Sequence, residues 1–119
     1  MKKSIIYLIL FFSVNSFAQN FGSWSETDSL NIERTGHAMV MLQNGNIFVS
    51  GNDAIDNSGS DKSCEIYDVT SKIWHQTTSL NKPKDMHHMM LLDNGEVLAF
   101  GGLWGRSCEI FNQLLRNGD

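Results

Sequence analysis

Two parts of this sequence repeat each other, and the repeat limits the possible folds more than any other feature. Residues 24–51 match residues 74–101 at a constant offset of 50. The matched pairs include Trp24 and Trp74, Arg34 and Lys84, His37 and His87, Asn44-Gly45 and Asn94-Gly95, and Gly51 and Gly101. Residues 63–67 (SCEIY) then match residues 107–111 (SCEIF) at an offset of 44. A deletion of six residues in the loop after Gly101 explains the change, because loops tolerate deletions better than paired strands do.

The local pattern within each copy predicts short antiparallel β-strands. Residues 36–42 (GHAMVML) are nearly all apolar or small, which predicts a strand buried on both faces. Asn44-Gly45 is a strong hairpin signal, because a type I′ turn needs positive φ at both central positions. Further strands are expected at 47–50, 64–69 and 73–78, and the second copy repeats the first three at 87–92, 97–100 and 107–111.

Four short strands in about 50 residues match the size of one Kelch-type propeller blade. Each copy has a histidine that opens the first strand, an Asn-Gly hairpin, a glycine pair or its equivalent, and a strand that begins Glu-Ile-aromatic. Through these elements, residues 22–112 resemble the Kelch repeats of galactose-oxidase-like proteins. The resemblance implies repeat-framework roles for Trp24, His37, Gly51, Tyr67, Trp74, His87, Gly101, Gly102 and Phe111.

The resemblance implies an all-β fold of two four-stranded antiparallel Kelch-type blades, the second incomplete, which form a partial β-propeller. The expected organisation is a leading strand at 22–28, blade one at 34–78, an incomplete blade two at 84–112 and a non-repeat tail at 113–119. Propellers typically have four to eight blades, so a pair of blades leaves apolar faces uncovered. We therefore expect weak stability or self-association through the exposed blade faces. The sequence leaves open whether the chain is a fragment of a longer propeller.

The N-terminus has the three parts of a secretory signal peptide. A positive start at 1–3 (MKK) precedes an apolar run at 5–14, and small residues lead to a predicted cleavage after Ala18. The apolar run is about half of the ~20 residues that cross a bilayer, which disfavours a membrane anchor. We expect a secreted or periplasmic protein with no membrane association after cleavage.

The charge of the processed chain argues against two classes of partner. Removing Lys2 and Lys3 from the 9 basic residues leaves 7 Lys and Arg against 13 Asp and Glu, a net charge of −6. The remaining basic residues do not cluster. Nucleic acids and anionic membrane surfaces are therefore not expected partners.

The two cysteines, Cys64 and Cys108, occupy the same position in the two copies. An exported protein favours disulfides in general. Equivalent atoms of neighbouring sheets, however, should lie beyond the ~7 Å between Cα atoms that a disulfide can span. We therefore expect two buried thiols that are not bridged.

The loops after Gly51 and Gly101 are expected to project from one rim, where partner contacts concentrate. The candidate binding residues are Asp53, Asp56, Asn57, Asp61, Trp104 and Arg106. Residues 52–62 carry many oxygen ligands of the kind that calcium uses, but their spacing fits no established calcium loop. A solvated loop is the favoured interpretation and calcium stays open, so neither a metal nor a cofactor is predicted.

His37 and His87 stand at equivalent positions, and a site repeated in every blade is usually structural. We expect each histidine to bond to backbone near the inner edge of its blade. The stretch 86–90 (MHHMM) also offers imidazole and thioether ligands that suit copper. Because side chains alternate along a strand, its two histidines would point to opposite faces, which favours packing over a metal site.

These features together predict a secreted Kelch-repeat protein that acts as a non-catalytic binding or interaction module, with a glycan or protein partner at the rim loops. The alternative is the N-terminal fragment of a secreted carbohydrate-active or oxidase enzyme whose active site lies in further blades. Galactose oxidase holds copper with two tyrosines and two histidines. Here the one tyrosine after the leader, Tyr67, stands at a framework position, so we expect no enzymatic activity from this chain.

Overall fold

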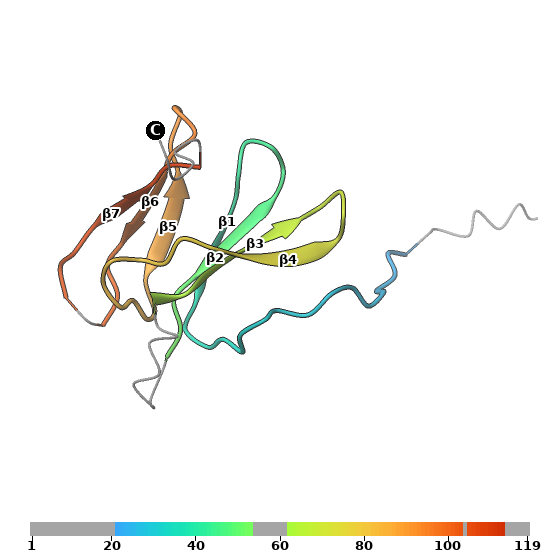
Figure 1. Ribbon diagram of the computed structural model, residues 1–119, viewed down its shortest axis with the longest axis horizontal. Coiled ribbons are helices and arrows are strands. Elements are labelled where there is room, and N and C mark those ends of the chain that lie inside the picture. Colours follow the sequence, from blue (N-terminus) through green and yellow to red (C-terminus); the bar gives the residue numbers. More distant parts are fainter. Residues whose placement is uncertain (1–20, 54–61, 104, 114–119) are drawn as a thin grey trace, which may run out of the picture.

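The computed structural model describes residues 21–53, 62–103 and 105–113 of the chain. Over these ranges the protein is all-β and forms two antiparallel sheets that do not close into a ring (Figure 1). The predicted all-β class is therefore confirmed. The predicted signal peptide lies outside the described residues. Within the described ranges, no helix is long and apolar enough to cross a membrane.

Sheet one consists of four strands in sequential order. They are β1 (Ala38–Met41), β2 (Ile47–Ser50), β3 (Cys64–Asp68) and β4 (Ile73–Thr77). The hairpin between β1 and β2 lies where Asn44-Gly45 predicts it, but its turn type differs from the expected I′. Gly45 has a φ of 86°, Asn44 is not among the residues with positive φ, and the amide of Gly45 donates to the carbonyl of Leu42 at 2.9 Å. A three-residue loop with one left-handed glycine therefore makes the turn.

Sheet two repeats the first three strands as β5 (His88–Leu91), β6 (Val97–Phe100) and β7 (Glu109–Phe111). The strand register is the same as in sheet one. Met89 lies opposite Ala99, as Met39 lies opposite Val49, at the offset of 50 found in the sequence. β7 is an edge strand in the described part of the chain, because no strand pairs with its outer side.

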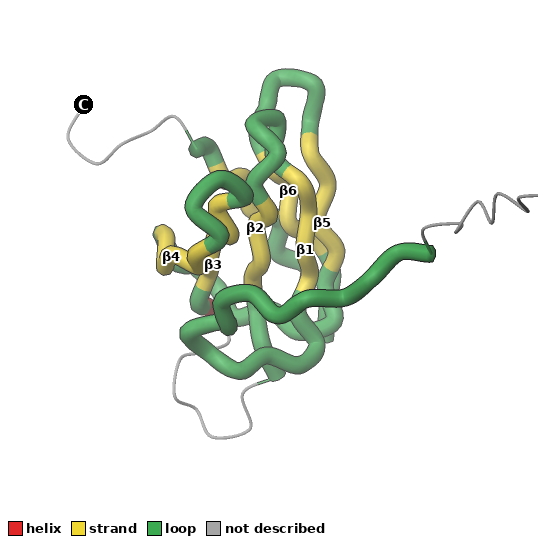
Figure 2. The backbone as a smooth tube through the Cα atoms, turned by 90° about the vertical axis from the view of Figure 1, so that its right-hand side faces the viewer, coloured by secondary structure: helices red, strands yellow, loops and turns green. Residues whose placement is uncertain are grey.

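The two sheets pack face to face, with β1 lying beside β5 (Figure 2). We call the face of sheet one that carries Val40, Phe48 and Ile66 its front, and the face of sheet two that carries Met89, Val97 and Phe111 its back. The core lies between these two faces, where the rings of Phe48 and Phe111 stack at 4.4 Å between centroids. The front of sheet one therefore packs on the back of sheet two, so the two contacting faces are not equivalent in the repeat.

The opposite two faces have no sheet against them in the described structure. The back of sheet one carries Met39, Met41, Ile47 and Tyr67, and the front of sheet two carries Met90, Leu98 and Ile110. Met39 is 57% exposed and Met90 is 54% exposed. The expectation that residues 36–42 form a strand buried on both faces is therefore wrong, because Met39 and Met41 on the back of β1 are exposed.

The segment before β1 does not form the strand that the sequence predicts at 22–28. Residues 21–30 have no regular structure, and their start leads away from both sheets in two views (Figures 1 and 2). The side chain of Trp24 is fully exposed, and Phe21 is 83% exposed. The segment lacks a strand partner, because β4 already occupies the outer edge of sheet one.

Candidate functional site

A buried carboxylate fixes the connection that enters sheet one. Glu65, on β3, accepts hydrogen bonds from the amides of Asn31 at 2.8 Å and Ile32 at 3.3 Å. The guanidinium of Arg34 donates to the same carboxylate at 2.8 Å, and neither charged side chain is exposed. Arg34 also donates to the carbonyl oxygens of Gly51 and Ser63, at 3.0 and 2.9 Å. A single ion pair therefore ties three segments of the chain together.

The environment of Glu65 keeps the carboxylate charged. Burial alone would raise its pKa, but the hydrogen bonds from Arg34 and Asn31 outweigh burial, and the net effect is a lowered pKa. An ionised carboxylate that accepts several charge-assisted and backbone bonds is a structural anchor. Its oxygens are already occupied, so this group serves the fold rather than a reaction.

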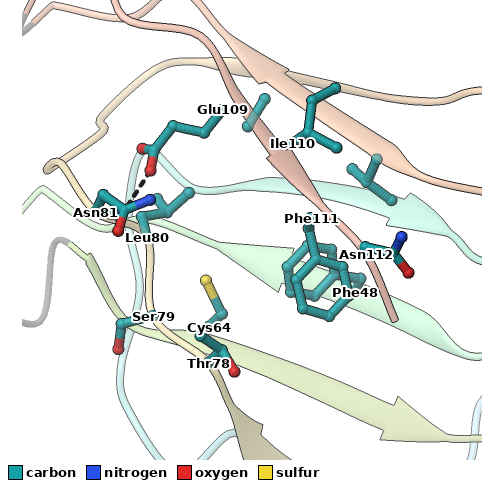
Figure 3. A pocket seen from close by; sticks show the side chains of 12 residues that line it. Phe48, Cys64, Thr78, Ser79, Leu80, Asn81, Glu109, Ile110, Phe111 and Asn112 are labelled. Carbon is teal, nitrogen blue, oxygen red and sulfur yellow. Dashed lines mark hydrogen bonds between the residues drawn. The ribbon is translucent and has the colours of Figure 1, made fainter. Parts of the chain in front are cut away.

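The second copy builds the same anchor from matching residues. Glu109 accepts hydrogen bonds from the amides of Asn81 at 2.7 Å and Lys82 at 3.3 Å (Figure 3). The ammonium of Lys84 donates to the carbonyl of Ser107 at 2.7 Å, as Arg34 does to Ser63. Lysine lacks the planar fork of arginine, and no ion pair between Lys84 and Glu109 forms within the described residues. The anchor is therefore looser in sheet two.

The histidine that opens the second copy lies between the two sheets. The Nε2 atom of His87 is 2.8 Å from the hydroxyl of Ser50, which in turn donates to the sulfur of Met89 at 3.0 Å. The hydroxyl has one hydrogen, so His87 donates to Ser50 from Nε2. Its Nδ1 atom is buried without a hydrogen-bond partner among the described residues. Burial, followed by the nearby charge of Lys84, lowers the pKa of His87 to about 4.

The two equivalent histidines were expected to share one role, in which each bonds to backbone, but their surroundings differ. His87 is buried and bonds to a side chain of the other sheet rather than to backbone, whereas His37 is exposed. The predicted alternation of residues 86–90 is confirmed, because His87 is buried and His88 is exposed. No group of three or more His, Cys, Asp or Glu side chains that could hold a metal ion occurs among the described residues.

A pocket of about 240 Å³ opens between the two sheets beside β7 (Figure 3). Its apolar wall consists of Phe48, Val97, Ala99 and Phe111, and its polar wall of Thr78, Ser79, Asn81 and Asn112. The volume is below the ~300–1,000 Å³ of pockets that hold drug-sized ligands. The Glu109 carboxylate at its edge is already bonded to two amides. The pocket is therefore suited to a small apolar group and lacks a poised acid or base.

The two cysteines are free, as expected, but only one of them is buried. Cys64 is 2% exposed beside the pocket, and burial raises the pKa of its thiol to about 11. It is therefore protonated and unreactive at neutral pH. Cys108 is exposed, and the prediction that it is buried is wrong, because the front of sheet two has no covering sheet.

The candidate binding residues at the rim divide into those the structure places and those it does not. Asp53 and Arg106 are exposed. They belong to the loops that follow β2 and β6, and the chain leaves these two strands at the same end of the sheets (Figure 1). Neither side chain has a hydrogen bond to another described residue. The remaining candidates, Asp56, Asn57, Asp61 and Trp104, lie outside the described residues. Residues 54–61, most of the loop for which calcium binding stays open, also lie outside the described residues.

The aromatic framework residues have different surroundings in the two copies. Tyr67 and Trp74 contact each other across β3 and β4, with ring centroids 5.1 Å apart. Phe111, the equivalent of Tyr67, instead stacks on Phe48 of the other sheet. Trp24, the equivalent of Trp74, contacts neither sheet and is fully exposed.

Three glycines that follow β2 and β6 adopt left-handed backbone, and two of them lie against backbone of a neighbouring segment. Gly51, Gly101 and Gly102 have φ values of 78°, 76° and 98°. A Cβ atom on Gly51 would lie 2.5 Å from the carbonyl oxygen of Lys84, and one on Gly102 would lie 2.6 Å from that of Asp85. Both positions therefore exclude a side chain on two independent grounds.

Sequence reasoning missed the two glutamate anchors and the role of Ser50. The signal for the anchors was present, because Glu65 and Glu109 recur in the repeat together with a basic residue at Arg34 and Lys84. A carboxylate and a cation that recur in register point to an ion pair between segments. Ser50 gave no such signal, because its equivalent in the second copy is Phe100.

Comparison with known proteins does not add to this description. No family model matches the chain, and no curated protein matches it.

Proposed function

We propose that this chain is a non-catalytic interaction module of a secreted Kelch-type propeller protein, and that a glycan or protein partner contacts the rim at which the loops 51–63 and 101–108 emerge. In this proposal the two sheets are consecutive blades. The sequential strand order, the shared register and the front-to-back packing support that interpretation. The charge pattern and the predicted signal peptide support export.

One observation favours the rim over the rest of the surface. The roots of the two loops are fixed in the same way, since the amide of Asp53 donates to Thr35 at 2.9 Å and that of Leu103 donates to Asp85 at 3.1 Å. Beyond these roots, Asp53, Leu103 and Arg106 are exposed, while the glutamates and cations of the anchors are engaged within the fold. Rigid roots that present exposed charged and apolar side chains suit recognition.

A matched pair of double variants tests the proposed rim. Asp53→Ala with Arg106→Ala removes one acid and one base from the rim, and Asp93→Ala with Lys72→Ala does the same at the opposite end of the sheets. The purified chains are titrated with defined oligosaccharides and with fractionated proteins of the exported compartment. We expect saturable binding to one class of probe and a loss of about tenfold, or ~1.4 kcal/mol, in the rim variant alone. No saturable binding to either class, or equal losses in both variants, would contradict the proposal.

The alternative, a fragment of a secreted enzyme, can be distinguished by the sequence of the gene. It requires further repeats encoded after codon 119 that carry tyrosine and histidine ligands for a copper site. Sequencing the gene past that codon distinguishes it from the interaction module. Further repeats without such ligands would remove the alternative and leave the rim proposal intact.

A further inference from the structure

Sheet two has a strand edge without a partner and an uncovered apolar face, and the two meet at β7. The outer edge of β7 has no strand partner in the described part of the chain, so its backbone groups are available for pairing. The adjoining front face exposes Ile110 by 52% and Met90 by 54%. An edge strand beside an uncovered apolar face is a template for a further strand and sheet.

The chain itself contains a segment with the sequence of the strand that sheet two lacks. In sheet one the corresponding edge, β3, pairs with β4. Residues 24–31 (WSETDSLN) match residues 74–81 (WHQTTSLN), which include most of β4. In this structure the segment pairs with no strand, although Thr27 and Asp28 bond to Tyr67 and Trp74 of sheet one, and its Trp24 is fully exposed. An exposed tryptophan on a segment that has no strand partner marks a surface available for contact with another molecule.

We propose that residues 23–27 of one copy pair with β7 of a second copy and complete its sheet two. The β3–β4 pairing gives the register. Tyr67 lies opposite Trp74 and Cys64 lies opposite Thr77. Transferred by the repeat offsets, Phe111 lies opposite Trp24 and Cys108 lies opposite Thr27. The association uses the edge and faces of the sheets, and is therefore independent of the rim proposed above for other partners.

The uncovered faces fit the same arrangement. The back of sheet one is the repeat copy of the back of sheet two, and the front of sheet two is the copy of the front of sheet one. Within one molecule, a front already packs against a back. A second molecule that donates its leading segment would place the back of its sheet one on the front of sheet two. This contact extends the packing that already forms the core.

The connection geometry allows both contacts at once. Residues 79–87 join β4 of sheet one to β5 of sheet two, and Glu109 fixes the start of this connection. Residues 29–37 are fixed by Glu65 in the same way, but residues 23–27 before them form no strand. The donor therefore meets the acceptor as sheet two meets sheet one within a single chain.

One cross-strand pair opposes the association and offers a sensitive test. Glu26 would lie opposite Glu109, whereas the equivalent pair in sheet one is Gln76 opposite Glu65. Like charges directly opposite each other weaken a strand pair. We expect Glu26→Gln to tighten the association roughly two- to fivefold, which corresponds to the usual range for such pairs.

Complementation between two variants tests the direction of the contact. Trp24→Ala disables the donor, Ile110→Asp disables the acceptor, and Phe21→Ala is the control, because Phe21 is an equally exposed aromatic outside the strand register. Sedimentation of the purified chains should show assemblies larger than dimers for the wild type and Phe21→Ala, since a head-to-tail contact propagates. Each disabled variant alone should be monomeric, and their mixture should form a dimer and nothing larger. Circular dichroism verifies that each variant is folded, and Met90→Asp replaces Ile110→Asp if it is not.

A cysteine pair tests the register itself. Opposite residues in an antiparallel pair have Cα atoms about 4.5–5.5 Å apart, which a disulfide can span. Thr27→Cys should therefore form an intermolecular disulfide with the exposed Cys108 under mild oxidation. Glu26→Cys, which points to the other face, should not, and adding Cys108→Ser to Thr27→Cys should abolish the product. A monomeric wild type, a mixture that stays monomeric, or equal cross-linking from positions 26 and 27 would each overturn the proposal.

Discussion

Glu65 and Glu109 stand at the same position of the two copies, but their surroundings differ. Glu65 forms an ion pair with Arg34 in which both side chains are fully buried. Glu109 accepts two backbone amides near solvent and has no such pair. The exchange of arginine for lysine at position 84 therefore separates two anchors that the repeat alone would make equal.

We expect the two glutamates to contribute unequally to stability. Glu65→Gln leaves the guanidinium of Arg34 buried without its charge partner, and should lower the free energy of unfolding by ~3–5 kcal/mol. Glu109→Gln weakens two partly exposed hydrogen bonds and should cost about 1 kcal/mol. Urea unfolding of both variants measures the difference. Equal losses in the free energy of unfolding would show that the buried ion pair stabilises the fold no more than the two hydrogen bonds of Glu109 do.

The pH dependence of stability should reveal the buried histidine. The pKa of His87 is lowered to about 4, so the unfolded chain takes up a proton near pH 6.5 that the folded chain refuses. Stability is therefore fully present above pH ~6.5 and falls as the pH drops toward 4. His87→Gln should flatten this part of the profile, whereas the exposed control His88→Gln should retain it. An unchanged slope in His87→Gln would refute the assignment. The lowered pKa of Glu65 acts in a separate window, below its unfolded pKa of about 4.3.

At the scale of the elements, β2 and β6 show how the same strand end serves two purposes. Each strand is followed by a glycine with positive φ, Gly51 or Gly101. At Gly51 the backbone of the second sheet's connection approaches closely, and the amide of Asn52 donates to Lys84 at 3.3 Å. At Gly101 a Cβ atom would meet nothing closer than His88 at 3.9 Å. The same strand end is therefore an intersheet contact in one copy and open in the other.

This difference predicts the outcome of two alanine substitutions. Both Gly51→Ala and Gly101→Ala place a side chain at positive φ, which costs about 1 kcal/mol. Gly51→Ala also brings a Cβ against the Lys84 carbonyl and the His87 ring, so the sheets must separate. We expect an additional loss of ~2 kcal/mol for Gly51→Ala. Thermal unfolding of the matched pair measures it, and identical midpoints would show that the close approach is relieved without cost.

At the scale of the whole molecule, the repeat predicted the order and pairing of the strands β1 to β7, but it also predicted a leading strand at 22–28 that does not form. Identical offsets gave the register of β5 and β6 from that of β1 and β2, because hairpin chemistry and side-chain alternation are local properties. Exposure was not predictable in this way. His37 and His87, and likewise Cys64 and Cys108, are equivalent in sequence, but one member of each pair is exposed and the other is buried. Which face is covered depends on how many sheets are stacked and in which direction.

The candidate site was predictable only where it follows the repeat. The glycine pair was identified because its backbone requirement is visible in the sequence. The contact from Ser50 to His87 joins two sheets at a position where the copies differ, so no comparison of the copies indicates it. The prediction of a type I′ turn was wrong for a related reason. Asn-Gly suits several hairpin loops, and the neighbouring backbone bonds select the three-residue form.

The glutamate anchors tie each connection to the sheet that follows it, while the strand before the connection belongs to the sheet that precedes it. The boundary between two units held together by an anchor therefore falls at a different point of the chain from the boundary between the two anchors' sheets: β4 belongs to sheet one, but the connection directly after it is bonded to sheet two. A gene that encodes such a chain gains a whole unit from the duplication of any stretch of one repeat length, wherever the breakpoints fall. Recombination between matching stretches of two copies can lengthen or shorten the protein without creating a new kind of junction to be packed.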